Sequence, residues 1–332
     1  MHGVHEVGSS SLPTPTVLPK NIMYSVLLYY KIIKIQHPES EVERHREICQ
    51  ALQLKGRILI GEDGVNGTVG GTVESIRLYR DYMNQHRIFK NIDFKESTSE
   101  IEPFPKLQVR ARNEIITTEI KDDIDWSQRG KYVDRDTFHQ WFIRGEDMVI
   151  LDMRNDYEWE IGRFVGSVKP PMKYFRDLKS CMNFYDQFKG KKIVMFCTGG
   201  VRCEPASALF VKYGFDQTQV YHLLGGIVKY AEKYGNDGFY EGKCFVFDNR
   251  VSVAVNTSDT AKIIGNCLHC NSNIDTYRNC DNKFCNRLFI ACDECNTKMQ
   301  NTCSVECTLL IVDPSNVRPP RANDVRTLHR NK

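Results

Sequence analysis

The chain has 332 residues, which is long enough for two or three domains, and its 41% hydrophobic and 26% charged residues are typical of an ordinary soluble protein. A net charge of +3 is too small to indicate a nucleic-acid partner by itself, so local clusters of charge must decide that question. No apolar run approaches the roughly 18 residues that a transmembrane helix needs, so no transmembrane helix is expected.

The first part of the chain, residues 1–20, contains three prolines and a run of three serines, but no basic start followed by an apolar core. This composition predicts a disordered leader and not a signal peptide. We therefore expect a cytoplasmic protein with no membrane partner, in a compartment where thiols stay reduced.

Residues 21–115 alternate between apolar strand patterns and amphipathic helix patterns in the order βαββαβ. Two helices on a small antiparallel sheet predict a ferredoxin-like (acylphosphatase-like) domain. The glycines at 61, 64 and 67 fit a hairpin that needs positive φ better than they fit a phosphate loop. The expected strands are 24–30, 57–60 and 68–69, and residues 93–95 and 107–112 are expected to supply the last strand. The expected helices are 41–54 and 73–86.

Cations alternate with apolar residues along one of these strands. Lys106, Arg110 and Arg112, together with Gln108, point to one face because side chains in a strand have a period of two. Such a face is either solvated or binds phosphate groups, since a sheet with several cations is a usual platform for RNA. This domain is therefore a candidate for RNA binding.

Residues 131–240 alternate between short buried strands and helices, which predicts a parallel sheet covered on both faces, an α/β domain. Ligand sites in such sheets lie beyond the carboxyl ends of the strands, where Cys197 and Asp152 both fall. Asp152 and Arg154 are expected to form a structural pair near the site. The expected elements are helix 135–144, strand 149–151, strand 220–223 and a helix that begins at 225–226 and continues through 234.

The apolar run at 193–196 ends at Cys197, and a helix is expected over 204–213. The backbone N–H groups of the intervening loop and the dipole of the following helix both favour an anion, so Cys197 is a candidate thiolate nucleophile. The alternative is a small buried hydrophobic residue. Cys203 is either a packed helix residue or a resolving thiol. The loop residues are Thr198, Gly199, Gly200, Val201, Arg202 and Cys203.

Residues 267–307 contain eight of the 13 cysteines, after a connecting segment at 241–266. Four cysteine pairs of this kind predict two tetrahedral zinc sites with four thiolate ligands each, and disulfides or free thiols are the alternative. The spacing does not show which pairs share a metal. A basic tail at 308–332 with arginines at 318, 321, 326 and 330 is expected to add weak contact with RNA. The proposed ligands are Cys267, Cys270, Cys280, Cys285, Cys292, Cys295, Cys303 and Cys307.

Three segments together, 152–162, 197–204 and 220–227, resemble a rhodanese domain. With the further segments 64–68, 104–107 and 242–250 and the cysteine-rich end, the chain resembles the rhodanese-containing tRNA uridine hydroxylases over residues 22–307. The resemblance implies oxygen-dependent 5-hydroxylation of the wobble uridine of tRNA. It also implies that Cys197 is the active-site cysteine, which rhodanese chemistry uses as a persulfide carrier, and that Arg202 is the arginine that closes its loop. Arg163 stands where many rhodaneses have histidine.

The expected enzyme is thus an oxidoreductase that uses O2 as co-substrate and tRNA as its partner. The reductant is not identified by any motif: we find no flavin or NAD fingerprint and no 2-His-1-carboxylate pattern, and zinc does not change its redox state. Two alternatives stay open on sequence grounds. One is a sulfurtransferase that moves sulfur through a persulfide on Cys197, and the other is a non-catalytic RNA-binding protein.

Overall fold

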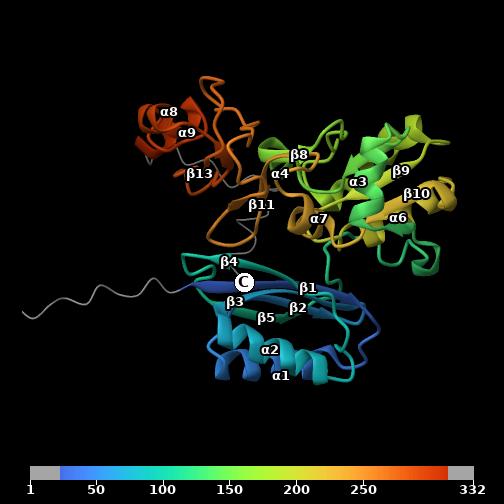
Figure 1. The fold of residues 1–332 in the computed structure, drawn as a ribbon. Helices are drawn as coiled ribbons and strands as arrows, with labels where there is room; N and C mark the ends of the chain where they lie inside the picture. Colours follow the sequence, from blue (N-terminus) through green and yellow to red (C-terminus); the bar gives the residue numbers. More distant parts are fainter. Residues whose placement is uncertain (1–22, 313–332) are drawn as a thin grey trace, which may run out of the picture.

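The computed structural model describes residues 23–312. The predicted leader at 1–20 and the four arginines of the predicted tail lie outside the described residues. Three units make up the fold: a sheet with two helices forms the lower half of Figure 1, and a parallel-sheet unit and a cysteine-rich unit lie above it. No helix among residues 23–312 is long and apolar enough to cross a membrane.

The first unit is a five-stranded sheet in the order β4-β1-β3-β2-β5. Its first four strands are antiparallel and have the ferredoxin-like order, which confirms the predicted fold, and β5 is parallel to β2. The elements are β1 (Tyr24–Ile32), α1 (Pro38–Ala51), β2 (Lys55–Gly61), β3 (Gly64–Thr72), α2 (Val73–Gln85), β4 (Lys95–Ser99) and β5 (Leu107–Ala111).

The two segments expected to supply one last strand instead lie at opposite edges of this sheet, as β4 and β5. Pro103 and Pro105 stand between them, and proline cannot continue a strand ladder. The chain therefore leaves β4 and crosses the sheet. Pro103 Cγ lies 2.4 Å from where a Cβ on Gly70 would sit, so the crossing requires glycine at this position of β3.

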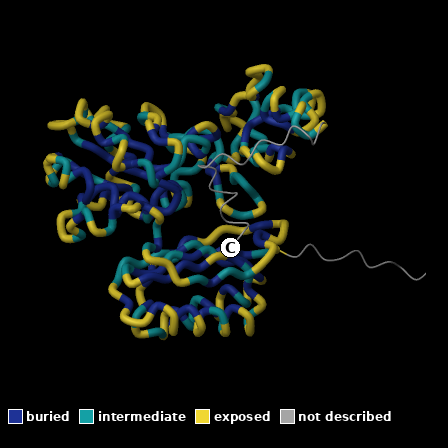
Figure 2. Tube along the Cα trace, turned by 180° about the vertical axis from the view of Figure 1, so that it is seen from behind, coloured by how far each residue is buried: buried dark blue, intermediate teal, exposed yellow. Residues whose placement is uncertain are grey.

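The two faces of the first sheet have different roles. Leu27, Tyr29 and Ile58 pack under α1 and α2 in the core of the unit. The residues that alternate with them, among them Leu28 and Arg57, point to the opposite face and line a cleft toward the second unit. Figures 1 and 2 show the helices on one side of the sheet and the second unit on the other.

The second unit is a four-stranded parallel sheet, as predicted, and its strand order is β6-β10-β9-β7. Two separate apolar clusters cover its faces, and every residue of β9 is buried between them. Its elements are β6 (Lys131–Val133), α3 (Arg135–Ile143), β7 (Val149–Asp152), α4 (Asp156–Ile161), β8 (Gly162–Phe164), α5 (Met182–Tyr185), β9 (Ile193–Phe196), α6 (Cys203–Lys212), β10 (Val220–Leu223) and α7 (Gly226–Tyr234). Short 3₁₀ turns are Trp126–Gln128, Phe175–Cys181, Asp186–Phe188 and Gln217–Gln219.

The segment 241–266, expected to be a connection, contains most of β11 (Tyr240–Phe245) and all of β12 (Ser252–Ala254). These strands join β8 in a small antiparallel sheet and so attach the end of the chain to the second unit. The cysteine-rich unit follows, with β13 (Tyr277–Asn279), β14 (Leu288–Ile290), α8 (Asp293–Lys298) and α9 (Val305–Val312).

Candidate functional site

Cys197 lies directly after the buried strand β9, at the carboxyl end of the parallel sheet, and its side chain is fully buried. The chain turns sharply at Gly200, where φ is +96°, and the Gly200 N–H donates a hydrogen bond to Cys197 Sγ over 3.1 Å. Helix α6 begins at Cys203, so its N-terminus faces the same sulfur. This is the strand, loop and helix arrangement that the sequence predicts around the thiol.

The environment of Cys197 stabilises its thiolate. Burial raises the pKa of this thiol, but a hydrogen bond from Cys203, the charge of Arg202 and the backbone N–H groups of Arg202 and Gly200 outweigh burial and lower the pKa to about 6. The pKa of the Cys203 thiol is raised, first by burial and then by its hydrogen bond to Cys197. At neutral pH, Cys197 is therefore mainly ionised and Cys203 is a protonated donor beside it.

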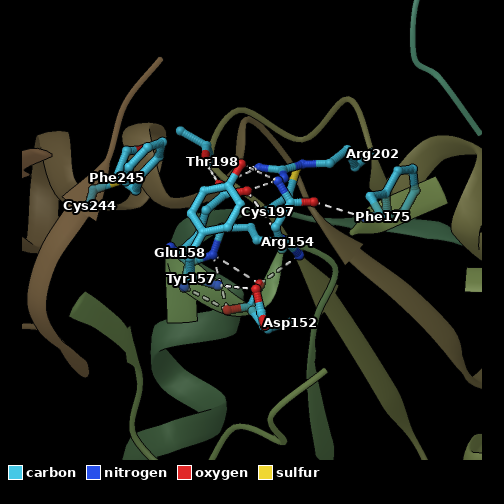
Figure 3. Close-up of polar contacts among 12 residues, drawn as sticks. Asp152, Arg154, Tyr157, Glu158, Phe175, Cys197, Thr198, Arg202, Cys244 and Phe245 are labelled. Atoms are coloured by element: carbon cyan, nitrogen blue, oxygen red, sulfur yellow. Dashed lines mark hydrogen bonds and ion pairs between the residues drawn. The ribbon is translucent and has the colours of Figure 1, made fainter. Parts of the chain in front are cut away.

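Glu158 on α4 holds the arginine of the loop in place. Arg202 donates to both carboxylate oxygens of Glu158, over 2.5 and 2.9 Å, and also to Thr198 Oγ1 over 3.2 Å. Figure 3 shows these contacts around Cys197. The carboxylate of Glu158 is fully buried, so the pair fixes the guanidinium close to the thiolate.

Asp152 and Arg154 form a buried ion pair beneath the loop. Arg154 Nη2 donates to Asp152 Oδ2 over 2.6 Å and to the Gly162 carbonyl over 2.6 Å, and its Nη1 donates to the Tyr240 hydroxyl over 3.2 Å. Both side chains are completely inaccessible to solvent. The pair links β7, β8 and β11.

The sequence reasoning gave no role to Glu158 or to Arg57. Glu158 also forms a capping box with Asn155 at the start of α4. This pattern is visible in the sequence, but it explains the glutamate as a helix cap and gives no sign of its contact with Arg202. Arg57 lies on β2, and burial together with the charges of Arg112 and Arg110 lowers its pKa. These three arginines are therefore close together.

The predicted RNA-binding residues lie at an edge of the first sheet. Arg110 is on β5, and Lys106 and Arg112 flank the two ends of this strand. Lys106 and Arg112 are exposed and Arg110 is half-buried. Arg57, which lies beside them, lines the cleft of Cys197. The cationic edge is thus connected to the cleft through Arg57.

The cleft of Cys197 has a volume of about 1720 Å³ and is bounded by all three units. The first unit contacts the second directly: the Tyr30 hydroxyl donates to Glu204 of α6 over 3.1 Å, and Lys229 of α7 forms an ion pair with Asp93 over 3.6 Å. The lining of the cleft includes Leu28 and Arg57 from the first unit, Cys197 and Arg202 from the second, and Phe284 and Arg287 from the cysteine-rich unit.

The eight cysteines of the last unit form two groups of four, each with its sulfur atoms within 4.8 Å of one another. A tetrahedral metal with bonds of about 2.3 Å to sulfur places its ligands roughly 3.8 Å apart. The sulfurs of Cys267 and Cys292 are 3.8 Å apart, and those of Cys303 and Cys307 are 3.9 Å apart. The groups fit a metal ion, and the pairs alternate along the chain: Cys267, Cys270, Cys292 and Cys295 form one group, and Cys280, Cys285, Cys303 and Cys307 form the other.

Three family models match the chain in succession: an acylphosphatase-like domain of the UPF0176 type at residues 24–115, a rhodanese-like domain at 135–233 and a rhodanese C-terminal region at 241–308. The tRNA uridine(34) hydroxylase of Cytophaga hutchinsonii is 40% identical over 86% of this chain and 89% of its own length. The chain belongs to the tRNA uridine(34) hydroxylase family. The hydroxylase of Oceanobacillus iheyensis is 39% identical over 87% of this chain and 90% of its own.

Among solved structures, a rhodanese-related protein from Thermoplasma volcanium matches 31% of this hydroxylase-family chain and 92% of its own length, with 17% identity and a TM-score of 0.25. The hydroxylase relatives align over 86% and 87% of the chain, which includes parts of all three units. The family assignment confirms the resemblance on which the sequence reasoning depended.

The low pKa of Cys197 predicts how this member of the hydroxylase family reacts with alkylating reagents. Because only the thiolate reacts, the rate of Cys197 modification by iodoacetamide should rise with pH and reach half its maximum near pH 6. Replacing Cys203 with alanine removes a hydrogen bond to the thiolate, so the midpoint should move to higher pH. Mass spectrometry of the peptide containing Cys197 measures the rate.

The matched control is Cys181→Ser, because Cys181 is a half-buried cysteine of the same unit that does not line the cleft. In the Cys181→Ser variant, the pH at which alkylation of Cys197 is half-maximal should equal that of the chain without substitutions. A midpoint near the ordinary cysteine value of about 8.5 in the unmodified chain would contradict the account of the loop.

Proposed function

We propose that this protein is an oxidoreductase that converts uridine 34 of tRNA to 5-hydroxyuridine, with Cys197 as its nucleophile. The observation that carries the proposal is the thiolate-stabilising loop of Cys197 in a cleft bounded by all three units. The relatives named tRNA uridine(34) hydroxylase align with most of the chain, and not with the rhodanese-like unit alone.

The chemistry requires a nucleophile and an oxidant. A uracil ring is electron-poor at C6, where a thiolate can add, and addition at C6 makes C5 electron-rich and open to oxidation. The net reaction replaces the C5 hydrogen with a hydroxyl group whose oxygen comes from O2, and an external donor supplies the two electrons that reduce the other oxygen atom to water. Cys197 leaves C6 as a thiolate when the double bond re-forms.

The protein residues prepare this step. Glu158 holds Arg202 beside the sulfur, and Arg202 and the backbone N–H groups keep the thiolate ready at neutral pH. The same groups stabilise the anionic sulfur when it is released. A cytosolic location, where thiols stay reduced, fits a thiolate nucleophile.

The target base is stacked within the anticodon loop, so the enzyme must take it out of that stack. We propose that Lys106, Arg110 and Arg112, together with Arg57, bind phosphate groups of the anticodon arm and direct the loop into the cleft. No ion pair neutralises Lys106, Arg110 or Arg112 within the described residues 23–312, so these three charges are available to an anionic partner.

Charge reversal at Lys106, Arg110 and Arg112 should weaken tRNA binding and reduce its salt dependence. Each lost phosphate contact lowers the slope of log affinity against log salt by about one. A titration of the triple glutamate variant with tRNA at several salt concentrations measures this. Glutamate at Arg87, Arg144 and Lys191, which are exposed and do not line the cleft, is the matched control. Equal losses in the two triple variants would remove the phosphate-binding face from the account.

We propose that zinc occupies the two four-cysteine groups and has a structural role. Four thiolates are the ligand set that zinc prefers in closed structural sites, and zinc supplies folding energy to a small segment with little apolar core. The groups are part of a unit whose Phe284 and Arg287 line the cleft. Zinc would thus hold one wall of the cleft in place and take no part in electron transfer.

The function is tested by expressing the chain in cells that lack their own hydroxylase and measuring the nucleosides of their tRNA by mass spectrometry. The proposal predicts 5-hydroxyuridine at position 34 in cells grown with oxygen and its loss without oxygen. A plain sulfurtransferase would instead move sulfur from thiosulfate in the absence of tRNA, and an RNA-binding protein would leave the nucleosides unchanged.

A further inference from the structure

The hairpin between β11 and β12 presents an exposed aromatic side chain within the cleft of Cys197. Phe247 is 62% exposed and lines the same cleft as the nucleophile. Its ring packs against Phe245, with centroids 5.2 Å apart, and the Arg202 guanidinium lies 5.9 Å from its centroid. A large apolar ring therefore lies in contact with the arginine that stabilises the Cys197 thiolate.

The hairpin is fixed to the first unit at its tip. The Asn249 N–H donates to the Pro103 carbonyl over 2.8 Å, and Arg250 donates to Ser97 Oγ over 2.9 Å. Arg250 also forms an ion pair with the buried carboxylate of Asp248 over 2.6 Å. Figure 1 shows the loop after β11 reaching down to β4. Because the three residues that follow Phe247 are anchored in this way, the turn holds the Phe247 ring exposed in the cleft.

The backbone of the hairpin is unusual at one residue. Val251 has φ of 62°, a conformation that is rare for a β-branched residue. The Val246 N–H donates to the Val251 carbonyl over 2.9 Å, so the turn that contains Phe247 is closed by this residue. Such conformations persist where the surrounding structure imposes them, and they gather at ligand sites.

We propose that Phe247 stacks on the base of uridine 34 and holds it beside Cys197. A base that leaves the anticodon stack loses its stacking neighbours, and an exposed aromatic ring replaces them. The cations that line the cleft, such as Arg57 and Arg287, are suited to phosphate groups, whereas Phe247 offers an apolar face to the base. This inference rests on the proposed function and identifies Phe247 as a residue that binds and positions the substrate.

The test measures binding and not turnover. The full chain is titrated with an anticodon stem-loop that has uridine at position 34 and with the same stem-loop lacking the base at that position. Loss of one base–aromatic stack costs about tenfold or more in affinity, so Phe247→Ala should weaken binding of the first RNA by about tenfold and leave binding of the abasic RNA unchanged. Phe247→Tyr should bind both RNAs as the unmodified chain does.

Phe184→Ala is the matched control, because Phe184 is a partly exposed phenylalanine of the second unit outside the cleft. It should leave both affinities unchanged. Equal weakening of both RNAs by Phe247→Ala, or no weakening of either, would overturn the inference. The proposed function fails separately, if the unmodified chain forms no 5-hydroxyuridine in cells.

Discussion

Replacing Cys197 with serine is expected to abolish formation of 5-hydroxyuridine. A serine hydroxyl stays protonated at neutral pH and cannot act as the thiolate does, so the loss should be at least roughly a thousandfold. The measurement is the amount of 5-hydroxyuridine in tRNA from cells that lack their own hydroxylase and express the variant. Serine is nearly isosteric with cysteine, and the hydrogen bond from Gly200 remains possible, so the loop should keep its fold.

Cys181→Ser is again the matched control and should give the normal level of 5-hydroxyuridine. Binding of the anticodon stem-loop to the Cys197→Ser variant should also be close to normal, because the cations and Phe247 are unchanged. Normal modification by the Cys197→Ser variant would show that the nucleophile is assigned to the wrong residue. Weak binding together with lost modification would instead indicate a damaged cleft.

Removing the proposed zinc ions is expected to unfold the cysteine-rich unit. Structural zinc contributes about 10–16 kcal/mol to the folding of small zinc-dependent domains, far more than the apolar contacts of a 41-residue segment with two short strands can replace. The purified chain should contain two zinc ions, and a strong chelator should make residues 267–307 sensitive to proteases. Metal analysis and limited proteolysis measure the two effects.

Single substitutions separate the two metal groups. Cys285→Ser and Cys295→Ser each remove one ligand from a different group, so each variant should retain one zinc ion. Cys181→Ser should retain two. The alkylation midpoint of Cys197 should stay near pH 6 in all three variants, because Cys203, Arg202 and Gly200, which lower the pKa of that thiol, lie outside the cysteine-rich unit. Loss of both ions from either variant, or a chain without zinc, would contradict two independent sites.

The parts of the site that are local in sequence could be predicted from it. A buried strand, a loop with two glycines and a helix follow one another within residues 193–212, so the position of Cys197 at an anion-stabilising turn follows from the order of the residues. The parallel sheet was predicted for the same reason, because each strand and the helix after it form one continuous unit. The ferredoxin-like order of the first four strands also follows from such a pattern.

The parts that depend on contacts between distant segments could not be predicted. Glu158 accepts a hydrogen bond from Arg202, which is 44 residues away in the sequence, and Tyr30 donates one to Glu204, which is 174 residues away. Nothing in the local pattern of β4 and β5 shows that they lie at opposite edges of the sheet. The cysteine pairs alternate between the two groups, so neighbouring pairs in the sequence belong to different groups. In the sequence, nothing distinguishes Phe247 from other apolar residues, because only the folded hairpin brings it close to Arg202.

The most direct test of the account is to grow cells that lack their own hydroxylase, but express this chain, under isotopically heavy O2. The nucleosides of their tRNA are then analysed by mass spectrometry. The account predicts 5-hydroxyuridine at position 34 that carries one heavy oxygen atom and depends on Cys197. Uridine 34 that stays unmodified, or 5-hydroxyuridine whose oxygen is not heavy, would contradict it.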